Sequence, residues 1–252
     1  MKRSVIEAHN QEAAAGRAAS NIVPAELSAE NIIVALDVAN ADAALDLVNR
    51  LRSTISRFKV GLQLYIAAGP PVVTRIIETG ARVFLDLKLH DIPNTVGGAV
   101  ESAASLGVEM LTVHLTGGQA MVRAAVEAAQ QRLMIIGVTV LTSHDHESLR
   151  RVGVIEGTEK QVGRLARLAV ECGAHGLVVS PHETAMIRSQ FGRELIVITP
   201  GIRPAGADAG DQKRVATPHS AIRAGADYLV IGRPINRDPD PVGAVHRILA
   251  GE

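Results

Sequence analysis

Three charged side chains stand close together in one short apolar stretch, residues 83–92. Asp86 and Lys88 fall two residues apart in a predicted strand, so both point to one face, about 6.6 Å apart along the strand. Asp91 follows just past the strand end, and His90 is interpreted as a packing or surface residue. Opposite charges on an inward face are costly to desolvate unless they pair. Three charges within six residues of an otherwise apolar element favour a functional site, with a purely structural ion pair as the alternative.

Two more charged residues are predicted to join this pair. Asp37 ends the first predicted strand and Lys59 lies in the second, while Asp86 and Lys88 lie in the third. Neighbouring strands are about 4.8 Å apart, so the four side chains can form one network of alternating charge. Alternation offsets the cost of burial and holds each side chain in place.

Strand-like and helix-like runs alternate along the chain. The strands are predicted at 31–38, 57–61, 82–89, 110–116, 133–142, 176–180, 195–202 and 228–235. The helices are predicted at 41–52, 70–79, 95–106, 119–131, 160–172, 182–191, 218–224 and 241–250. Eight such units predict an α/β protein with the (β/α)₈ TIM-barrel fold. A doubly wound open sheet is the alternative, but the residues after the first strand lack its glycine-rich fingerprint.

The barrel is expected to form a single domain over residues 29–252. Residues 1–28, rich in Ala, Glu and Asn, are expected to form an N-terminal extension that is helical or partly disordered. Glycines at 80, 107, 173 and 225 follow predicted helices, as expected for left-handed residues that end helices.

Composition narrows the class of protein. Hydrophobic residues make up 47% and aromatic residues only 2%, which is typical of aliphatic parallel strands covered by helices. With 26 basic and 26 acidic residues, nothing in the net charge indicates a nucleic-acid partner. No apolar run approaches the roughly 20 residues of a membrane span, and the N-terminus lacks a secretory signal. The lone Cys172 fits a reducing compartment, so we expect a cytoplasmic protein with no membrane partner.

A second constellation follows the last two predicted strands. Residues 199–204 and 231–234 each combine a glycine with an arginine, Arg203 and Arg233. Loops at these places commonly build the phosphate site of barrel enzymes. Glycines let backbone N–H groups approach an anion, and guanidinium groups add charge-assisted hydrogen bonds. The loop 205–214 is long enough to act as a lid.

These motifs together resemble one family. They are residues 35–37, 58–61, 84–95, 138–143, 199–204 with 210–212, and 228–234. Over residues 30–240 the chain resembles the orotidine 5′-phosphate decarboxylase family. The resemblance implies a TIM barrel that works as a homodimer without metal or organic cofactor. It also implies the reaction, decarboxylation of orotidine 5′-phosphate to uridine 5′-phosphate, the last step of de novo pyrimidine nucleotide synthesis.

The resemblance assigns catalytic roles to the charged network. Lys88 matches the lysine that delivers the proton to the ring carbon losing carbon dioxide, and Asp86 matches the carboxylate facing the departing group. Lys59 matches the lysine that bridges the two acids and touches the ribose. Asp37 matches the ligand of a ribose hydroxyl. Asp91 matches an acid that completes this network, and with Asp86 it is expected to keep the lysine charged.

The resemblance also assigns contacts outside the network. Asp91, Ile92 and Thr95 match residues that reach into the site of the partner subunit. Thr142 matches a pyrimidine contact. The phosphate-side contacts that match are Arg203, Gln212, Gly232 and Arg233.

Two other functions remain open on the sequence alone. One is a magnesium-dependent sugar-phosphate lyase of the same superfamily, like 3-hexulose-6-phosphate synthase, which carries an acidic metal ligand where this chain has Lys59. A lysine there repels a dication, which disfavours this reading. The other is a non-catalytic barrel that only binds a phosphate ligand.

Overall fold

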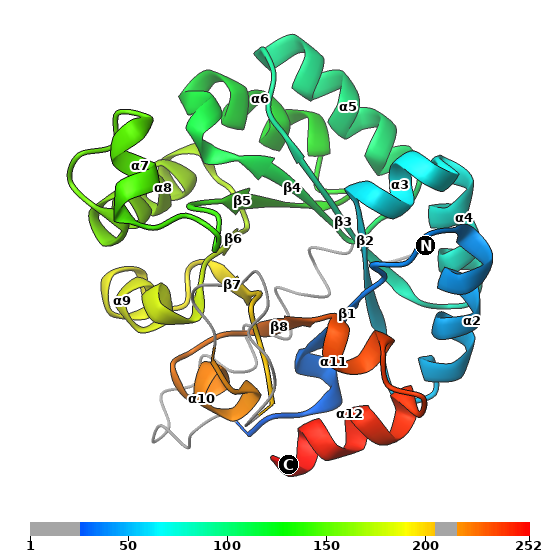
Figure 1. Ribbon diagram of the computed structural model, residues 1–252. Helices are drawn as coiled ribbons and strands as arrows, with labels where there is room; N and C mark the ends of the chain where they lie inside the picture. Colours follow the sequence, from blue (N-terminus) through cyan, green and yellow to red (C-terminus); the bar gives the residue numbers. More distant parts are fainter. Residues whose placement is uncertain (1–25, 205–215) are drawn as a thin grey trace.

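The protein forms a closed barrel of eight parallel strands, which a computed structural model describes for residues 26–204 and 216–252 (Figure 1). Each strand pairs with its neighbours in chain order, and β1 closes the ring against β8. The strands are β1 (Ile32–Ala35), β2 (Arg57–Gly61), β3 (Arg82–Leu89), β4 (Met110–His114), β5 (Met134–Val138), β6 (Gly176–Val178), β7 (Ile196–Thr199) and β8 (Tyr228–Ile231). The predicted TIM barrel is therefore confirmed.

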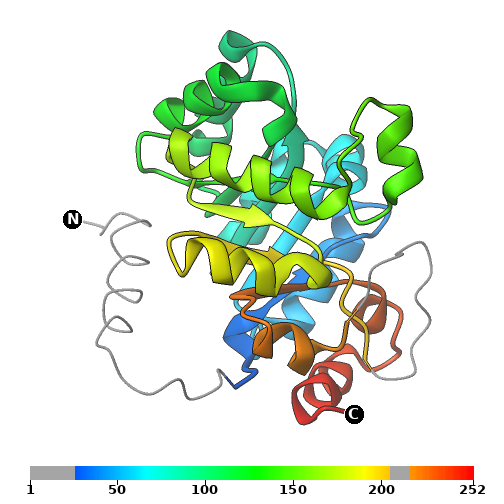
Figure 2. The ribbon, with the colours of Figure 1, turned by 90° about the vertical axis from the view of Figure 1, so that its left-hand side faces the viewer.

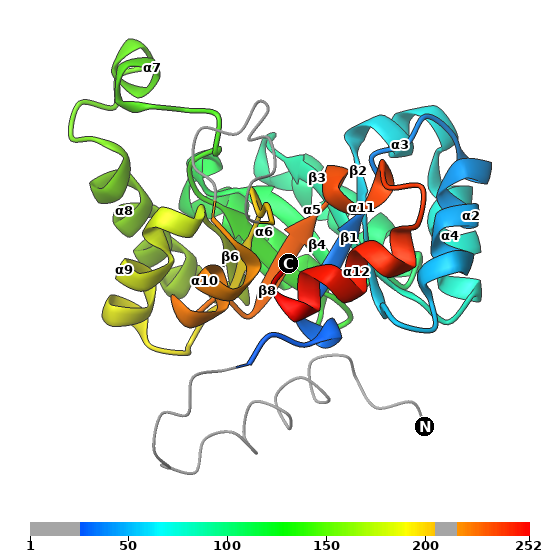
Figure 3. The same ribbon diagram turned by 60° about the horizontal axis from the view of Figure 1, so that its bottom comes forward.

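Helices surround the barrel and connect successive strands. They are α2 (Ala41–Leu51), α3 (Leu62–Ala68), α4 (Pro70–Glu78), α5 (Pro93–Ser105), α6 (Gly118–Ala129), α7 (His146–Arg151), α8 (Thr158–Cys172), α9 (Pro181–Phe191), α10 (Pro218–Arg223), α11 (Arg233–Asn236) and α12 (Pro241–Ala250). Figure 2 shows α8 and α9 side by side on the outside. Figure 3 shows α12, which contacts α2 and so completes the outer ring. Within the described part of the chain, no helix is both long and apolar enough to cross a membrane.

Alternating side chains on each strand divide the core into two parts. In β1, Ile33 and Ala35 join the cluster inside the barrel, whereas Ile32 and Val34 pack outward under the helices. All four are at most 2% exposed. Strands buried on both faces favour aliphatic residues throughout, which accounts for the composition.

Buried charges close the end of the barrel opposite the polar strand ends. Arg57 opens β2, and its Nε lies 3.0 Å from Glu109. Its Nη1 lies 3.0 Å from Glu30, and its guanidinium stacks over the Tyr228 ring at 4.8 Å. Burial opposes the charge of Arg57, but Glu109 more than compensates and raises its pKa. Lys59 follows two residues later on the same inward face, so β2 carries one cation at each end of the barrel.

Several predicted strands are too long at their carboxyl ends. The first was predicted to residue 38 but ends at Ala35, the fifth to 142 but ends at Val138, and the eighth to 235 but ends at Ile231. After Ile231 the chain turns at Gly232 into α11. Some of the residues beyond these strand ends, among them Val38, Val140 and Thr142, line a cavity.

Other differences concern helices. The short helices α3, α7 and α11 were not predicted. The predicted glycine caps are confirmed: Gly80, Gly107, Gly173 and Gly225 all have positive φ. Residues 1–25 of the expected extension, and the whole of the predicted lid at 205–214, lie outside the described residues.

Candidate active site

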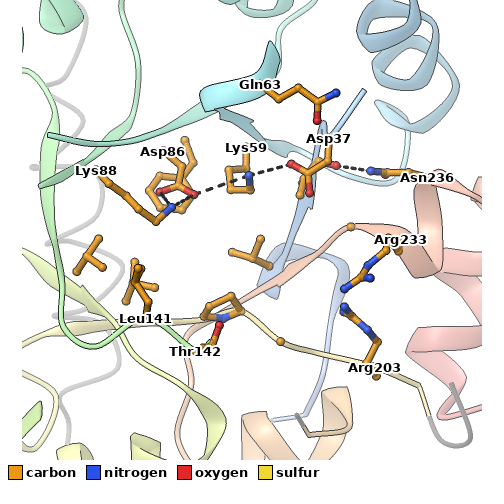
Figure 4. Close-up of a pocket in the computed structure, with 18 of the residues that line it drawn as sticks. Asp37, Lys59, Gln63, Asp86, Lys88, Leu141, Thr142, Arg203, Arg233 and Asn236 are labelled. Atoms are coloured by element: carbon orange, nitrogen blue, oxygen red, sulfur yellow. Dashed lines mark hydrogen bonds and ion pairs between the residues drawn. The ribbon is translucent and has the colours of Figure 1, made fainter. Parts of the chain in front are cut away.

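A cavity of about 610 Å³ opens at the carboxyl ends of the strands (Figure 4). Many of the predicted site residues line it, although they come from distant parts of the chain. They are Asp37, Lys59, Asp86, Lys88, Thr142, Arg203, Gly232 and Arg233. Gln212 lies outside the described residues. The aliphatic walls include Val138, Val140, Val178 and Val230.

The predicted network of alternating charge is present along one side of the cavity (Figure 4). Lys59 Nζ lies 3.1 Å from Asp37 Oδ1 and 3.7 Å from Asp86 Oδ2. Lys88 Nζ lies 2.8 and 2.7 Å from the two carboxylate oxygens of Asp86. Each cation thus contacts an acid, and Asp86 contacts both cations. Such a network fixes an ammonium group at the cavity wall.

Burial and neighbouring charges shift the pKa of Asp86 in opposite directions. Its side chain is only 12% exposed, and burial alone raises a carboxyl pKa. The ammonium groups of Lys59 and Lys88 outweigh that effect, and with hydrogen bonds from Lys88 and Thr112 they hold the pKa of Asp86 below its ordinary value. Asp86 is therefore a carboxylate at neutral pH.

Strand β3 is irregular where it carries the site. Leu85 pairs with Leu111 of β4, but the next pair joins Leu89 to Val113. Three residues of β3, 86–88, therefore lie opposite the single residue Thr112 of β4, and Lys88 has a φ of +52°. A left-handed, non-glycine residue is strained and tends to occur where function requires it. This backbone brings the Lys88 ammonium back onto the Asp86 carboxylate.

Two glycines leave room for the network. A Cβ on Gly61 would lie 2.8 Å from Lys59 Nζ, and one on Gly232 would lie 3.2 Å from Asp37 Oδ2. Neither distance is compatible with the present side-chain positions without a shift. The glycines at the ends of β2 and β8 thus allow the charged groups to stand close to the backbone.

Two arginines converge at the other side of the cavity. Arg203 follows β7 and is only 8% exposed, and its Nη1 donates to the carbonyl of Ile202 at 2.8 Å. Arg233 opens α11 after β8. Figure 4 shows the two guanidinium groups pointing toward one another at the cavity wall. Adjacent cations of this kind favour a bound anion, and Arg binds phosphate well.

Three predicted site residues do not line this cavity. Asp91 and Ile92 lie between β3 and α5, and Thr95 lies in the first turn of α5; all three are exposed. The Asp91 carboxylate accepts the Ile92 N–H at 2.7 Å. The Ile92 side chain is 66% exposed, which is unusual for an isoleucine. These residues are therefore exposed to solvent and do not line the cavity of their own chain.

Sequence reasoning missed four polar residues near the site. Gln63, Asn236 and Arg237 line the cavity from α3 and the end of α11, two helices that were not predicted. Thr112 bonds to both Asp86 and Lys88. Its signal was present in the sequence, since Thr112 is a polar residue amid the apolar strand 110–113.

The two histidines beside β3 lie outside the cavity lining. His90 is exposed, and its ring centroid is 5.5 Å from that of His114. Burial, with the charges of His90 and Lys88, lowers the pKa of His114. Across residues 26–204 and 216–252, no three His, Cys, Asp or Glu side chains gather so that they could hold a metal ion.

Comparisons with known proteins all indicate the same family. Residues 30–248 match the family model described as "Orotidine 5'-phosphate decarboxylase / HUMPS family". An orotidine 5′-phosphate decarboxylase of Moorella thermoacetica is 52% identical over 230 residues, which cover 88% of this chain and 91% of the relative. One from Anaeromyxobacter dehalogenans is 50% identical over 222 residues, covering 88% and 98%.

Solved structures are similar over the same region. The crystal structure of orotidine 5′-phosphate decarboxylase from Lactobacillus acidophilus superposes with a TM-score of 0.78 at 33% identity, covering 88% of this chain and 98% of that one. An uncharacterized conserved protein from Geobacillus kaustophilus gives 0.77 at 34% identity, covering 87% and 99%.

Proposed function

The chain belongs to the orotidine 5′-phosphate decarboxylase / HUMPS family, and on that premise we propose that it decarboxylates orotidine 5′-phosphate to uridine 5′-phosphate. This is the last step of de novo pyrimidine nucleotide synthesis. The observation that carries the proposal is the charged network Asp37–Lys59–Asp86–Lys88, which stands across one cavity from Arg203 and Arg233. A nucleotide with a carboxylate on its base and a phosphate on its ribose fits both sides of the cavity. Its carboxylate would lie at the charged network and its phosphate at the two arginines.

The reaction poses one physical problem. When the bond to the carboxylate breaks, its electron pair stays on the ring carbon, where resonance stabilises it little. We propose that the Lys88 ammonium stabilises this developing charge and then donates a proton to the same carbon. Carbon dioxide leaves and uridine 5′-phosphate remains. Asp86, beside the departing carboxylate, adds a repulsion that disappears as carbon dioxide leaves.

The remaining cavity residues bind the parts of the substrate that do not react. Asp37 and Lys59 are proposed to bind the ribose hydroxyls, and Thr142 the pyrimidine. Arg203, Gln212, Gly232 and Arg233 are proposed to bind the phosphate. Binding energy from a remote phosphate can be used to order the site around the reacting carbon.

We also propose a homodimer in which Asp91, Ile92 and Thr95 reach the partner subunit's site. Their exposure supports this arrangement, because none of them lines the cavity of its own chain. Asp91 would add a carboxylate to the partner's Lys88, and Ile92 would bury an apolar surface that is now 66% exposed.

The magnesium-dependent lyase of the same superfamily is disfavoured by the position of Lys59. Its ammonium lies between the carboxylates of Asp37 and Asp86, at 3.1 and 3.7 Å. A dication bound by those acids would have to displace this cation. The curated relatives described above are also named as decarboxylases.

A turnover assay tests the proposal. Orotidine 5′-phosphate is added to the purified protein in buffer with EDTA, and the loss of substrate absorbance is followed beside a sample with added magnesium. Equal turnover in both is expected. No turnover in either buffer would contradict the proposed reaction, and turnover of a sugar phosphate only with magnesium would support the lyase instead.

A further inference from the structure

We propose that Thr112 is the positioning residue that holds Asp86 and Lys88 in their reactive arrangement. The inference rests on the proposed function, since it concerns the groups that carry out that reaction. Three features of the structure support it: the hydrogen bonds of Thr112, the irregularity of β3, and the position of Thr112 outside the cavity lining.

One hydroxyl connects the two charged residues. Thr112 Oγ1 accepts the backbone N–H of Lys88 at 2.8 Å and donates to Asp86 Oδ1 at 3.0 Å. The directions follow from chemistry, because an ionised carboxylate can only accept and a backbone N–H can only donate. Thr112 is completely buried, so no water competes for its hydroxyl. The side chain thus ties the carboxylate of one residue to the backbone of the other.

The backbone of Lys88 needs such support. β3 bulges between Leu85 and Leu89, which pair with Leu111 and Val113, the two neighbours of Thr112. The bulge therefore stands directly opposite Thr112. In a regular ladder a carbonyl of β4 would accept an N–H from this part of β3, whereas here the Thr112 hydroxyl accepts it. Lys88 is left-handed at this point, a conformation that persists only where surrounding contacts enforce it.

Thr112 acts through its neighbours and not on the substrate. It does not line the cavity, and its hydroxyl points to Asp86 and Lys88. Removing the hydroxyl should therefore reduce the rate of the chemical step and leave ligand binding intact. A one-ångström displacement of reacting groups can reduce a rate by roughly 100-fold.

Three variants test the proposal. Thr112→Val removes the hydroxyl and keeps the shape, and Thr112→Ser keeps the hydroxyl. Thr184→Val removes a hydroxyl that is also completely buried but bonds to Ser180 and Thr199 instead. We expect Thr112→Val to lower kcat by roughly 10- to 100-fold, with the dissociation constant of uridine 5′-phosphate within about threefold of wild type. Thr112→Ser should restore most of kcat, and Thr184→Val should leave kcat per active site unchanged.

A crystal structure of Thr112→Val provides a readout that does not depend on activity. We expect Lys88 to leave the left-handed region or its ammonium to move away from Asp86. Unchanged geometry together with unchanged kcat would overturn the proposal, and so would an equal loss in Thr112→Val and Thr112→Ser. If Thr112→Val does not fold, Thr112→Ala replaces it. Failure of the wild-type protein to turn over substrate would refute the proposed function, whereas the crystal structure would still decide whether Thr112 positions Lys88.

Discussion

The Lys88 ammonium contacts both carboxylate oxygens of Asp86, at 2.8 and 2.7 Å, from a residue only two positions further along the same strand. The left-handed backbone of Lys88 makes this close contact possible. The ammonium therefore stays next to an acid that a second cation, Lys59, also contacts. A fixed cation beside the reacting carbon needs no reorganisation when negative charge develops, and this is the main source of catalysis in the proposed mechanism.

Lys88→Ala is expected to abolish decarboxylation. The change removes the proton donor and the cation that stabilises the carbanion, so kcat should fall by at least about 10⁴-fold. The variant should remain folded and still bind uridine 5′-phosphate in a calorimetric titration. Lys160→Ala, which removes an exposed lysine of α8, is the matched control and should retain full activity. Activity of Lys88→Ala within tenfold of wild type would rule out its assigned role.

Arg233→Ala is expected to weaken recognition of the phosphate. Loss of charge-assisted contacts should reduce kcat/KM for orotidine 5′-phosphate. The reduction should correspond to a loss of transition-state stabilisation of roughly 2–4 kcal/mol. Orotidine, which lacks the phosphate, should be a poor substrate for wild type and variant alike. Arg52→Ala removes an exposed arginine next to α2 and serves as the control. Equal losses with both substrates would mean that Arg233 has a structural role.

Gly61→Ala is expected to displace the Lys59 ammonium. The added Cβ would stand 2.8 Å from Nζ, while the φ of −97° at Gly61 is allowed for alanine, so the backbone is not strained. We expect kcat/KM to fall roughly 10- to 100-fold because the network is misplaced. Gly163→Ala in α8, whose Cβ would meet only ordinary contact at 3.5 Å, should change neither kcat nor KM. A fully active Gly61→Ala protein would show that the position of Lys59 is not critical.

Site residues on regular strands could be predicted from the sequence, whereas contacts made by an irregular backbone could not. The alternation of β2 and of the regular part of β3 correctly predicted Lys59 and Asp86 at the cavity, because side-chain direction in a strand follows a period of two. Lys88 also lines the cavity, but it lies within the bulge of β3, where that period is broken. The sequence did not predict the bulge of β3, since a non-glycine residue with positive φ leaves no signal of its own. Thr112 could have been noticed as a polar residue between apolar neighbours, but its hydrogen bond to the Lys88 backbone arises from that bulge and could not be predicted.

The order and type of the main strands and helices were predicted correctly, but the carboxyl ends of several strands were not. Strand cores are set by aliphatic runs buried on both faces, and these runs were recognised. The carboxyl ends were predicted too long at Val138 and Ile231, because hydrophobic residues such as Val140 and Ile235 continue beyond the strands and pack from loops or from α11. Helix α11 has only four residues, too few for a helical period to be detected.

Stability should depend on pH through Asp86. Its pKa in the folded protein is lower than its ordinary value of 3.8, so the unfolded chain binds the proton more readily. The stabilisation from its ionised form is therefore fully present above that value and is lost as the pH falls through the folded-state pKa. Asp86→Asn should lower the free energy of unfolding by about 1–3 kcal/mol near pH 7, because Lys59 and Lys88 then lack their shared acid. In urea titrations this difference should shrink below pH 3.8; a difference that stays constant would contradict the assignment.

The last prediction concerns the proposed exchange of residues between subunits. Asp91 is exposed and does not line the cavity of its own chain. If it completes the partner's site, Asp91→Ala and Lys88→Ala proteins should each be nearly inactive, and mixing them should restore activity. In a heterodimer one site receives both defects, while the other combines an intact Lys88 with the partner subunit's Asp91.

The amount of activity that should return can be calculated from the number of intact sites. After full exchange of equal amounts, about half of the dimers are mixed, and each has one working site of two, so activity should approach roughly a quarter of wild type per total site. Native mass spectrometry measures the heterodimer fraction in the same sample. A mixture of Lys88→Ala with Asp86→Asn is the control: these two residues pair within one chain, so each site of that heterodimer carries one defect and no activity should return. Heterodimers that form in the Asp91 mixture but restore no more activity than the control would show that Asp91 does not act across the interface.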